Sequence, residues 1–424
     1  MSRFQMRTCA WLTIVCSSAL SLSAATSCVN PQGSGGCVKS IVAAVSAANA
    51  GDTVYVSAGT YAENVIVGKS LSLIGADPAK TIIEATGLPN AVYVNGLDNP
   101  NLAGIFISGF TLQNANYEGL LVTNASNVTI SGNILTGNDK SLAFGAQGPT
   151  CPGIPAFETG EGFDCGEAVH FSGVHHSSVI NNNIQNNAGG ILLSDDTGAT
   201  HDNLITGNIV SNNPSDCGIT LASHPPAAIT ASMDHFGVYS NHIVSNQASQ
   251  NGLKGEGAGV GLFASDPGSK TYANVVVNNT LTGNNLPGIA VHGHTPGQTL
   301  DGHVIIGNTL SGNGPDTDDA ATPGTAGIAF FSVSPVAGTL ISQNTFSNQS
   351  IAVVWNAPGE AKVQRNSFAD PVGIYNLGPG TVSGEGNWWG CSGNPNSLIA
   401  YFGGCSGIRG AVGVTTWLTA APAK

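Results

Sequence analysis

The stretch Asn133-Ile134-Leu135-Thr136-Gly137-Asn138 contains the pattern from which the fold can be predicted. It consists of an Asn, any residue, an apolar residue, two small or polar residues and a second Asn. Further copies span Asn208–Asn213, Asn241–Asn246, Asn279–Asn284 and Asn308–Asn313, and looser copies start at Asn183, Asn344 and Asn366. The shortest intervals are roughly 21–25 residues, which indicates an array of internal repeats with loop insertions.

A second pattern, a Gly followed by alternating apolar residues, comes after the Asn copies. Clear examples begin at Gly190, Gly218, Gly288 and Gly327. Short strands with a period of two bury one face, and a single unit cannot bury that face alone, so neighbouring units must stack. Asn tolerates the left-handed backbone of tight corners, and stacked Asn amides can form hydrogen-bonded ladders. The repeats therefore predict an all-β solenoid.

The ladder prediction is specific. We expect Asn208, Asn279 and Asn308 to occupy one stacked corner. Their apolar neighbours should lie near the core wall; these are Ile209, Leu281 and Leu310.

The composition excludes several other classes of protein. Charged residues are 9% of the 424-residue chain, against about 25% in a typical soluble protein, and 57 residues are Gly, which argues against a helical bundle. Disorder fits poorly, because 41% of the residues are hydrophobic. With 12 Lys and Arg against 25 Asp and Glu, the chain lacks the basic surface that nucleic-acid binding requires.

Residues 1–25 have the pattern of a secretory signal peptide. Arg3 and Arg7 form a positive region, Trp11 to Leu22 an apolar one, and Ser23-Ala24-Ala25 a cleavage site. The apolar run is shorter than the roughly 20 residues of a membrane span. We therefore expect a secreted or periplasmic protein with no membrane attachment after cleavage. Removing the two Arg from a chain of formal charge −13 leaves −15.

Seven Cys remain after this cleavage, and six of them form close pairs in the sequence. In an exported chain such pairs favour disulfides over metal sites, so we expect the bonds Cys28–Cys37, Cys151–Cys165 and Cys391–Cys405. Cys217 is left over and is predicted to be a buried small hydrophobic residue.

Both ends of the repeat array resemble a known family, the right-handed parallel β-helix of pectin-lyase-like proteins. The resemblance rests on Ile41 to Ala50, on Gly51 to Tyr61 with its final Gly-Thr-Tyr, and on Gly386-Asn387-Trp388-Trp389-Gly390, which is like the closing coil of proteins with copper-maturation-factor-type repeats. It implies a single-stranded right-handed parallel β-helix over residues 51–410, an N-terminal cap with a short helix at 26–50 and a C-terminal tail at 411–424. Trp388 and Trp389 are expected to pack in the last coil.

Candidate site residues gather in the central coils. All ten His lie between His170 and His303, and an inserted loop at 145–165 contributes Glu158, Glu161 and Asp164. Aligning the coils on Gly166, Gly190, Gly218, Gly261, Gly288 and Gly327 puts Asp195 and Asp266 in one column, two coils apart. Coils about 4.8 Å apart would then separate the two carboxylates by roughly 9–10 Å.

This separation is at the upper edge of the range used by inverting glycosidases, about 6.5–9.5 Å. Asp195, Asp266 and His224 are therefore the predicted catalytic residues, with His224 between the two carboxylates. The predicted substrate-binding residues, which lie in the neighbouring columns, are Asp196, His170, His292 and His294. The alternative is that Asp and His here are ordinary turn and surface residues.

Comparison with enzymes of the pectin-lyase-like family leaves the chemistry open. The polygalacturonase-like signatures are incomplete, because His292-Gly293-His294 lies several coils from Asp195-Asp196, and the Asp-Pro-His-Glu phrase of alginate epimerases is absent. No metal site is assigned, and Ca²⁺ would be a cofactor only if the enzyme is a lyase. In that case Lys254 or His292 is the better candidate for the base. A surface of charge −15 repels a polyuronate unless Ca²⁺ bridges the two.

We therefore predict an exported monomer that acts on or binds extracellular polysaccharide, as a glycoside hydrolase or a polysaccharide lyase. A non-catalytic glycan-binding or cell-surface β-helix protein is the alternative. A periplasmic metal-handling β-helix protein is the third hypothesis.

Overall fold

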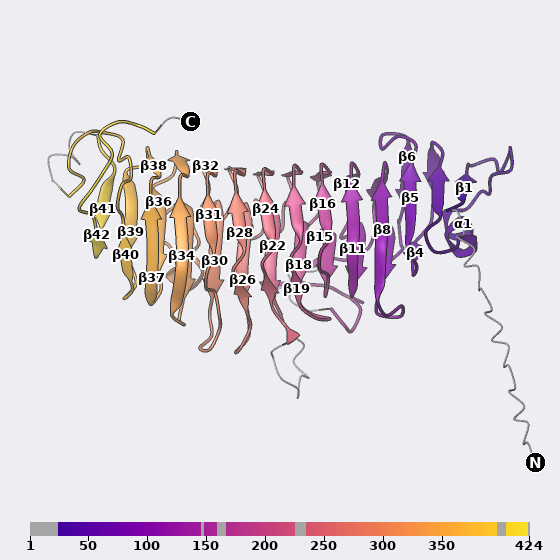
Figure 1. The fold of residues 1–424 in the computed structure, drawn as a ribbon, viewed down its shortest axis with the longest axis horizontal. Helices are drawn as coiled ribbons and strands as arrows, with labels where there is room; N and C mark the ends of the chain where they lie inside the picture. Colours follow the sequence, from indigo (N-terminus) through magenta and orange to yellow (C-terminus); the bar gives the residue numbers. More distant parts are fainter. Residues whose placement is uncertain (1–23, 146–147, 159–166, 225–234, 397–403, 423–424) are drawn as a thin grey trace, which may run out of the picture.

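The protein folds as a parallel β-helix, as the repeats predict. The computed structural model describes residues 24–145, 148–158, 167–224, 235–396 and 404–422. Three long parallel sheets run along the axis of the molecule, with the first coil and the last coil at opposite ends (Figure 1). A complete coil passes from a 14-stranded sheet through an 11-stranded sheet to a 12-stranded sheet.

The strands of the three sheets follow one another in chain order. The 14-stranded sheet contains β1 (Thr26–Val29), β2 (Thr53–Val56), β5 (Leu71–Gly75), β8 (Leu102–Ser108), β11 (Ala125–Ser131), β16 (Ser178–Ile180), β20 (Leu204–Thr206), β24 (His242–Val244), β28 (Val275–Val277), β31 (Val304–Ile306), β34 (Val336–Ser342), β37 (Gly359–Gln364), β40 (Thr381–Ser383) and β42 (Val412–Gly413). The 11-stranded sheet contains β3 (Gly59–Tyr61), β6 (Thr81–Glu84), β9 (Thr111–Gln113), β12 (Ile134–Thr136), β17 (Asn183–Gln185), β21 (Ile209–Ser211), β25 (Gln247–Ser249), β29 (Thr280–Thr282), β32 (Thr309–Ser311), β35 (Thr345–Ser347) and β38 (Ser367–Phe368). The 12-stranded sheet contains β4 (Val65–Val67), β7 (Val92–Asn95), β10 (Leu120–Thr123), β15 (Glu167–Ser172), β18 (Gly189–Ser194), β22 (Ile219–Ser223), β26 (Val260–Ala264), β30 (Ile289–Gly293), β33 (Ala326–Ser332), β36 (Ile351–Asn356), β39 (Val372–Asn376) and β41 (Gly407–Arg409).

Two small sheets lie outside this framework. An antiparallel pair is formed by β13 (Ala143–Gly145) and β14 (Gly148–Thr150). A three-stranded parallel sheet is formed by β19 (Thr200–His201), β23 (Val238–Tyr239) and β27 (Thr271–Tyr272).

A short helix, α1 (Ile41–Ala47), covers the N-terminal end of the core. The Ser40 hydroxyl accepts a hydrogen bond from the Ala43 amide, and the Glu63 carboxylate accepts from the Ile41 and Val42 amides, so the helix N-terminus is satisfied. Ile41, Ala44 and Val45 are buried, whereas Val42 points outward. The predicted helical cap is confirmed.

The predicted Asn corner is also confirmed, and it is longer than the repeat pattern suggests. Nine Asn stack between the 14-stranded and 11-stranded sheets, and each one after the first accepts at Oδ1 from the backbone and side-chain amides of the preceding one: Asn133, Asn182, Asn208, Asn246, Asn279, Asn308, Asn344, Asn366 and Asn387. Leu281 and Leu310 are buried as expected. The expectation for Ile209 is wrong, because Ile209 is 46% exposed and Val210 faces the core.

The C-terminal end is closed by aromatic packing. Trp389 is fully buried against Phe368, with ring centroids 4.9 Å apart, which confirms the expected packing role. Strand pairing continues past residue 410, since β42 pairs with β40.

Two of the three predicted disulfides are present, Cys28–Cys37 and Cys391–Cys405. Cys165 lies outside the described residues, so its bond to Cys151 stays a prediction, as does the signal peptide, of which 1–23 are not described. Cys217 is buried, and its sulfur accepts a hydrogen bond from the Ala258 amide. None of the helices in the described ranges has the length and apolarity of a membrane span.

Candidate functional site

The outer face of the 12-stranded sheet carries a pocket of about 440 Å³ in the central coils. The pocket forms because alternate residues of β30 point in opposite directions: Ile289 and Val291 enter the core, so His292 points outward. The lining residues come from β26 and β30 and from loops next to β22, β26, β30 and β33. They are Asp216, Cys217, His224, Glu256, Phe263, Ala264, Ser265, Leu286, His292, His294, Asp316 and Asp318.

His292 is the most enclosed imidazole of this pocket, with 5% of its surface exposed. Its Nδ1–H donates to Asp316 Oδ2 at 2.9 Å, and Asp316 is itself buried. In the neutral ring this bond makes Nε2 the acceptor nitrogen; within the described part of the chain Nε2 has no hydrogen-bond partner, and Asp319 Oδ2 lies 3.9 Å from it. Nε2 is therefore oriented to accept a hydrogen from a bound molecule.

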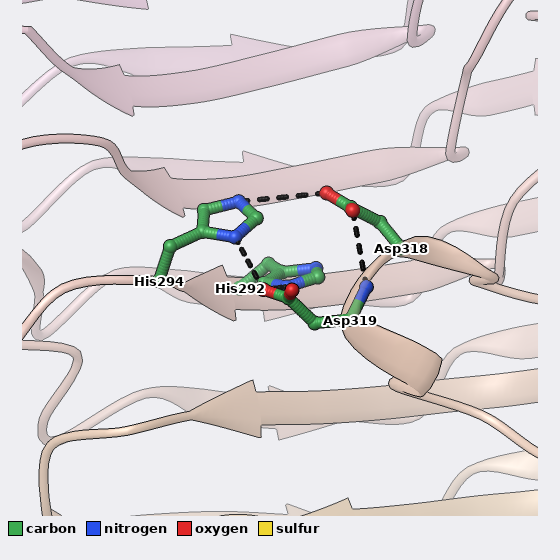
Figure 2. A group of neighbouring side chains, drawn as sticks. All are labelled: His292, His294, Asp318 and Asp319. Carbon is green, nitrogen blue, oxygen red and sulfur yellow. Dashed lines mark hydrogen bonds and ion pairs between the residues drawn. The ribbon is translucent and has the colours of Figure 1, made fainter.

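His294 lies at the open side of the same pocket. Its Nδ1–H donates to Asp319 Oδ2 at 2.6 Å, its Nε2 is 3.7 Å from Asp318 Oδ2, and its ring stacks on His292 at 4.3 Å between centroids (Figure 2). About 45% of the His294 side chain is exposed. Both ring nitrogens thus face carboxylates that water also reaches.

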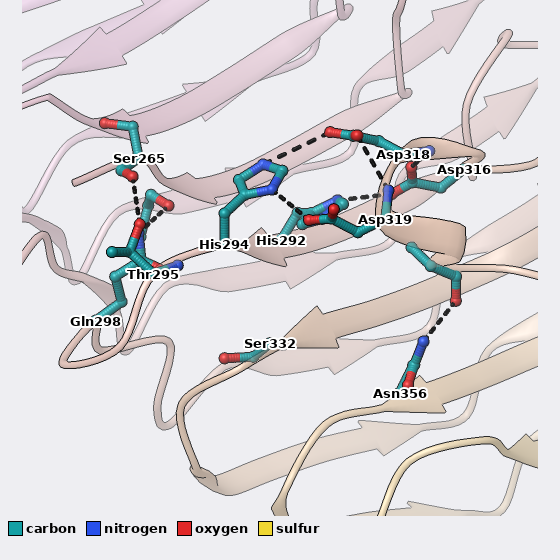
Figure 3. A network of polar contacts seen from close by, with 12 residues as sticks. Ser265, His292, His294, Thr295, Gln298, Asp316, Asp318, Asp319, Ser332 and Asn356 are labelled. Atoms are coloured by element: carbon teal, nitrogen blue, oxygen red, sulfur yellow. Dashed lines mark hydrogen bonds and ion pairs between the residues drawn. The ribbon is translucent and has the colours of Figure 1, made fainter. Parts of the chain in front are cut away.

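These carboxylates come from the loop between β32 and β33. The loop contains a short 3-10 helix, η2 (Asp318–Ala320), and folds over the outer face towards His292 and His294 (Figure 3). Asp316 fixes the loop, because its backbone exchanges hydrogen bonds with the Thr322 hydroxyl and its Oδ1 accepts from the Asp318 amide.

Glu256, from the loop before β26, lines the pocket beside this group. Desolvation, followed by the negative charges of Asp318 and Asp316, raises the pKa of Glu256 above its ordinary value. A carboxyl group whose pKa is raised by burial and by neighbouring carboxylates is a common feature of acid–base sites.

The same residues include a group that could hold a metal ion. His292, His294, Asp318 and Asp319 each offer a ligand atom, and these atoms lie within 4.8 Å of one another. The group is open to solvent, and the His294–Asp319 hydrogen bond satisfies part of it without a cation.

The predicted column of Asp195 and Asp266 is wrong. Pairing of β22 with β26 puts Ile219 opposite Val260 and Ser223 opposite Ala264, so Gly218 aligns with Gly259 and not with Gly261. Pairing of β15 with β18 likewise puts Ala168 opposite Gly190, where the prediction has Gly166. Asp266 therefore lies two residues beyond the Asp195 column, exposed in a turn closed by Ser269.

Asp195 lies in a closed environment rather than on the open face. Its carboxylate accepts from the Ser223 hydroxyl at 2.8 Å and from the His224 amide at 2.6 Å, and it has no exposed surface. Burial raises the pKa of Asp195 to about 6. Through this bond Asp195 positions the backbone of His224, whose side chain does line the pocket.

His170 lies in β15, four strands from His292, and Asp196 follows β18; neither residue lines the pocket, and His170 does not share a column with His292. The register pairs His292 with Phe263, Ala222 and Ser194, whereas His170 pairs with Leu192. His170 Nε2 contacts Ser194 Oγ at 2.8 Å, and Ser194 Oγ donates to Asp196. A buried acidic group surrounds His170.

The other His are dispersed over the solenoid. His175 and His201 belong to a stack of rings that continues through Tyr239 and Tyr272, and His303 is buried at a corner. The sequence pattern therefore identified His224, His292 and His294 as pocket residues; it missed the acidic lining residues Asp216, Glu256, Asp316 and Asp318, and also Asp319, which contacts His294. The acidic run from Asp316 to Asp319 is a signal in the sequence that could have revealed them.

The sequence model of a protein family described as the right handed β-helix region matches residues 84–313 of this chain. The chain belongs to the right-handed β-helix family. No curated protein sequence matches it at a significant level. Among solved structures, the Dettilon tailspike protein is similar, with 14% identity, a TM-score of 0.56, and 86% of this chain and 62% of that chain covered.

The catalytic domain of a GH87 α-1,3-glucanase in complex with tetrasaccharides is similar too, with 14% identity, a TM-score of 0.50, and 86% and 63% of the two chains covered. The protein ORF18 of Geobacillus virus E2 has 13% identity and a TM-score of 0.45, with 73% and 54% covered. The chain of this protein thus covers less than two thirds of the length of each of these three structures. At such identities the likeness shows the fold alone.

Proposed function

We propose that this β-helix protein is a glycoside hydrolase that cleaves an uncharged extracellular polysaccharide in the pocket around His292. The observation that carries the proposal is that Glu256 and Asp318 line the same pocket on the outer face and interact electrostatically. The two come from different loops, and the charge of Asp318 is among the causes of the raised pKa of Glu256.

Each carboxyl group has a role in glycoside hydrolysis. Glu256 keeps its proton to higher pH and acts as the general acid towards the leaving-group oxygen. Asp318 acts as the second carboxylate, which attacks the sugar or activates water. His292 Nε2, oriented by Asp316, accepts a hydrogen bond from a sugar hydroxyl.

The charge of the pocket supports an uncharged substrate. Among its described lining residues four are acidic and none is Lys or Arg. A polyuronate would be repelled there, and the β-elimination of a lyase needs a cation on the uronate carboxylate. The fold is also that of a glucanase domain solved with tetrasaccharides, so α-glucans are the first substrates to test.

The test is release of reducing sugar from a panel of uncharged and uronic-acid glycans, each with and without Ca²⁺. Glu256→Gln and Asp318→Asn should each lower kcat by about 10²–10⁴-fold while the melting temperature is retained. Glu360→Gln, which changes an exposed acid of β37 in a different sheet, is the matched control and should be active. Full activity of both pocket variants would overturn the assignment; glycan binding without cleavage would favour the non-catalytic alternative, and unsaturated products would show a lyase.

A further inference from the structure

A second group of ionisable side chains is buried on the outer face of the 12-stranded sheet, and none of its members lines the pocket. Glu118 precedes β10, Glu158 follows β14, and His170 is in β15. Exposed fractions are 0% for Glu118, 8% for Glu158 and 1% for His170. His170 is four strands from His292, or about 19 Å along the sheet, and none of these three residues lines the pocket, so the group is distinct from the proposed active site.

The hydrogen bonds around His170 fix which of its nitrogens carries the proton. Ser194 Oγ donates its hydrogen to Asp196, so its lone pairs accept from His170 Nε2–H at 2.8 Å. In the neutral imidazole, Nδ1 is then the acceptor nitrogen. It points at Glu118 Oε1, 3.6 Å away, and at Glu158 Oε2, 4.0 Å away.

This arrangement brings one imidazole and two carboxyl groups together where water hardly reaches. Within the described part of the chain, His170 Nδ1, Glu118 Oε1 and both Glu158 oxygens have no hydrogen-bond partner. One ligand atom from each of the three residues lies within 4.8 Å of the others. Two buried carboxyl groups can lie this close only if a proton or a cation offsets their charge: without a cation, burial and the charge of Glu118 raise the pKa of Glu158 well above its ordinary value, and a cation at the centre can take the place of that proton.

We propose that Glu118, Glu158 and His170 bind a divalent first-row transition-metal ion. Two carboxylates and one imidazole form a mixed oxygen and nitrogen set, which suits Zn²⁺ or Mn²⁺ better than Ca²⁺, whose ligands are oxygens. The Ser194–Asp196 pair has the role that carboxylates and hydroxyls have behind metal-binding His residues, because it holds the ring orientation and the tautomer. Asn90 Nδ2 donates to Glu118 Oε2 and supports this carboxylate in the same way.

The experiment uses the whole chain, stripped with a chelator and titrated with Zn²⁺ by calorimetry, with metal content measured after gel filtration. Wild type should bind one equivalent in this group, and Glu118→Gln should weaken that binding by 100-fold or more. Ser194→Ala, which touches no ligand atom, should weaken it by about 10–100-fold, as is typical for residues behind a metal ligand. Asp370→Asn removes a buried carboxylate at the far end of the solenoid and should bind like wild type.

A second readout separates this site from the exposed group at His294. Co²⁺ bound to the buried group should give a visible absorption spectrum. Ser194→Ala should change this spectrum, whereas the double variant His294→Gln with Asp318→Asn should leave it unchanged. The spectra locate the metal even if Glu118→Gln fails to fold. Absence of Zn²⁺ uptake by wild type would overturn the proposal. Loss of uptake in the His294 and Asp318 variants alone would also overturn it. Neither result depends on glycan cleavage.

Discussion

His303 occupies the coil position that follows Asn274 in a corner ladder of the solenoid. Asn203, Asn241 and Asn274 stack before the 14-stranded sheet, each accepting from the amides of the preceding rung. Because Val275 pairs with Val304, His303 takes the next rung, where an imidazole replaces the amide. It has no exposed surface.

This position predicts acid sensitivity. Burial lowers the pKa of His303 to about 4, below its unfolded value of 6.5, so on acidification the unfolded chain takes up the proton first and stability falls. The contribution lost between pH 7 and pH 5 should be about 2 kcal/mol. The free energy of unfolding of the wild type, measured in urea at pH 7 and at pH 5, should include this loss. In His303→Asn the difference between the two pH values should be smaller by that amount. An unchanged difference between the two pH values would contradict the prediction.

Asp195 should have the opposite pH dependence. Its pKa of about 6 is above its unfolded value of 3.8, so the folded state holds the proton longer and stability falls as pH rises from about 4 to 6. Across this pH range the titration of Asp195 should lower the free energy of unfolding by about 3 kcal/mol in total. Asp195→Asn should show a less negative slope of unfolding free energy against pH than wild type in that window. A slope equal to that of wild type would show that Asp195 does not titrate there.

The Asn ladder should make a large contribution to stability at each rung. Asn279 donates from Nδ2 to Ile243 O and Asn308 Oδ1, and its Oδ1 accepts from two amide nitrogens of Asn246. Asn279→Ala leaves buried polar atoms without partners and should cost about 2–4 kcal/mol in denaturant unfolding.

The adjacent Asn278 is the control for this variant. It is exposed and has a left-handed backbone, φ 57°, which Gly adopts readily. Asn278→Gly should change stability by less than about 0.5 kcal/mol. Equal effects at the two neighbouring positions would mean that the ladder bonds add little.

The acid–base assignment predicts a change in the pH profile of catalysis. Asp316→Asn removes one of the charges that raise the pKa of Glu256, so the alkaline limb of kcat/KM should move to lower pH. KM should rise as well, because His292 loses its carboxylate acceptor. Glu360→Gln should leave the limb in place. A limb that does not move in Asp316→Asn would exclude Glu256 as the general acid.

The repeats determined the fold because they act through the conformation and side-chain pattern of a few neighbouring residues. An Asn at every corner and strands with a period of two specify a solenoid, and they also specify which face of β30 is outward. That is why His292 and His294 could be chosen as binding residues from the sequence. The register around Gly259 could not be predicted, because glycines at 257, 259 and 261 allow alignments that differ by two residues. A shift of two keeps every side chain on the same face, so the hydrophobic pattern does not distinguish the alignments.

Only the tertiary structure decided which side chains meet. The separation of Asp195 from Asp266 depended on the pairing of Val260 with Ile219, which packing of the coils selects. The acids around His292 and His170 come from loops of unequal length, and where such a loop folds over the sheet depends on contacts distant in the chain. The sequence thus determined the solenoid and its outward face, because these follow from a repeated local pattern. The sites on that face depended on long-range packing, which no repeat encodes.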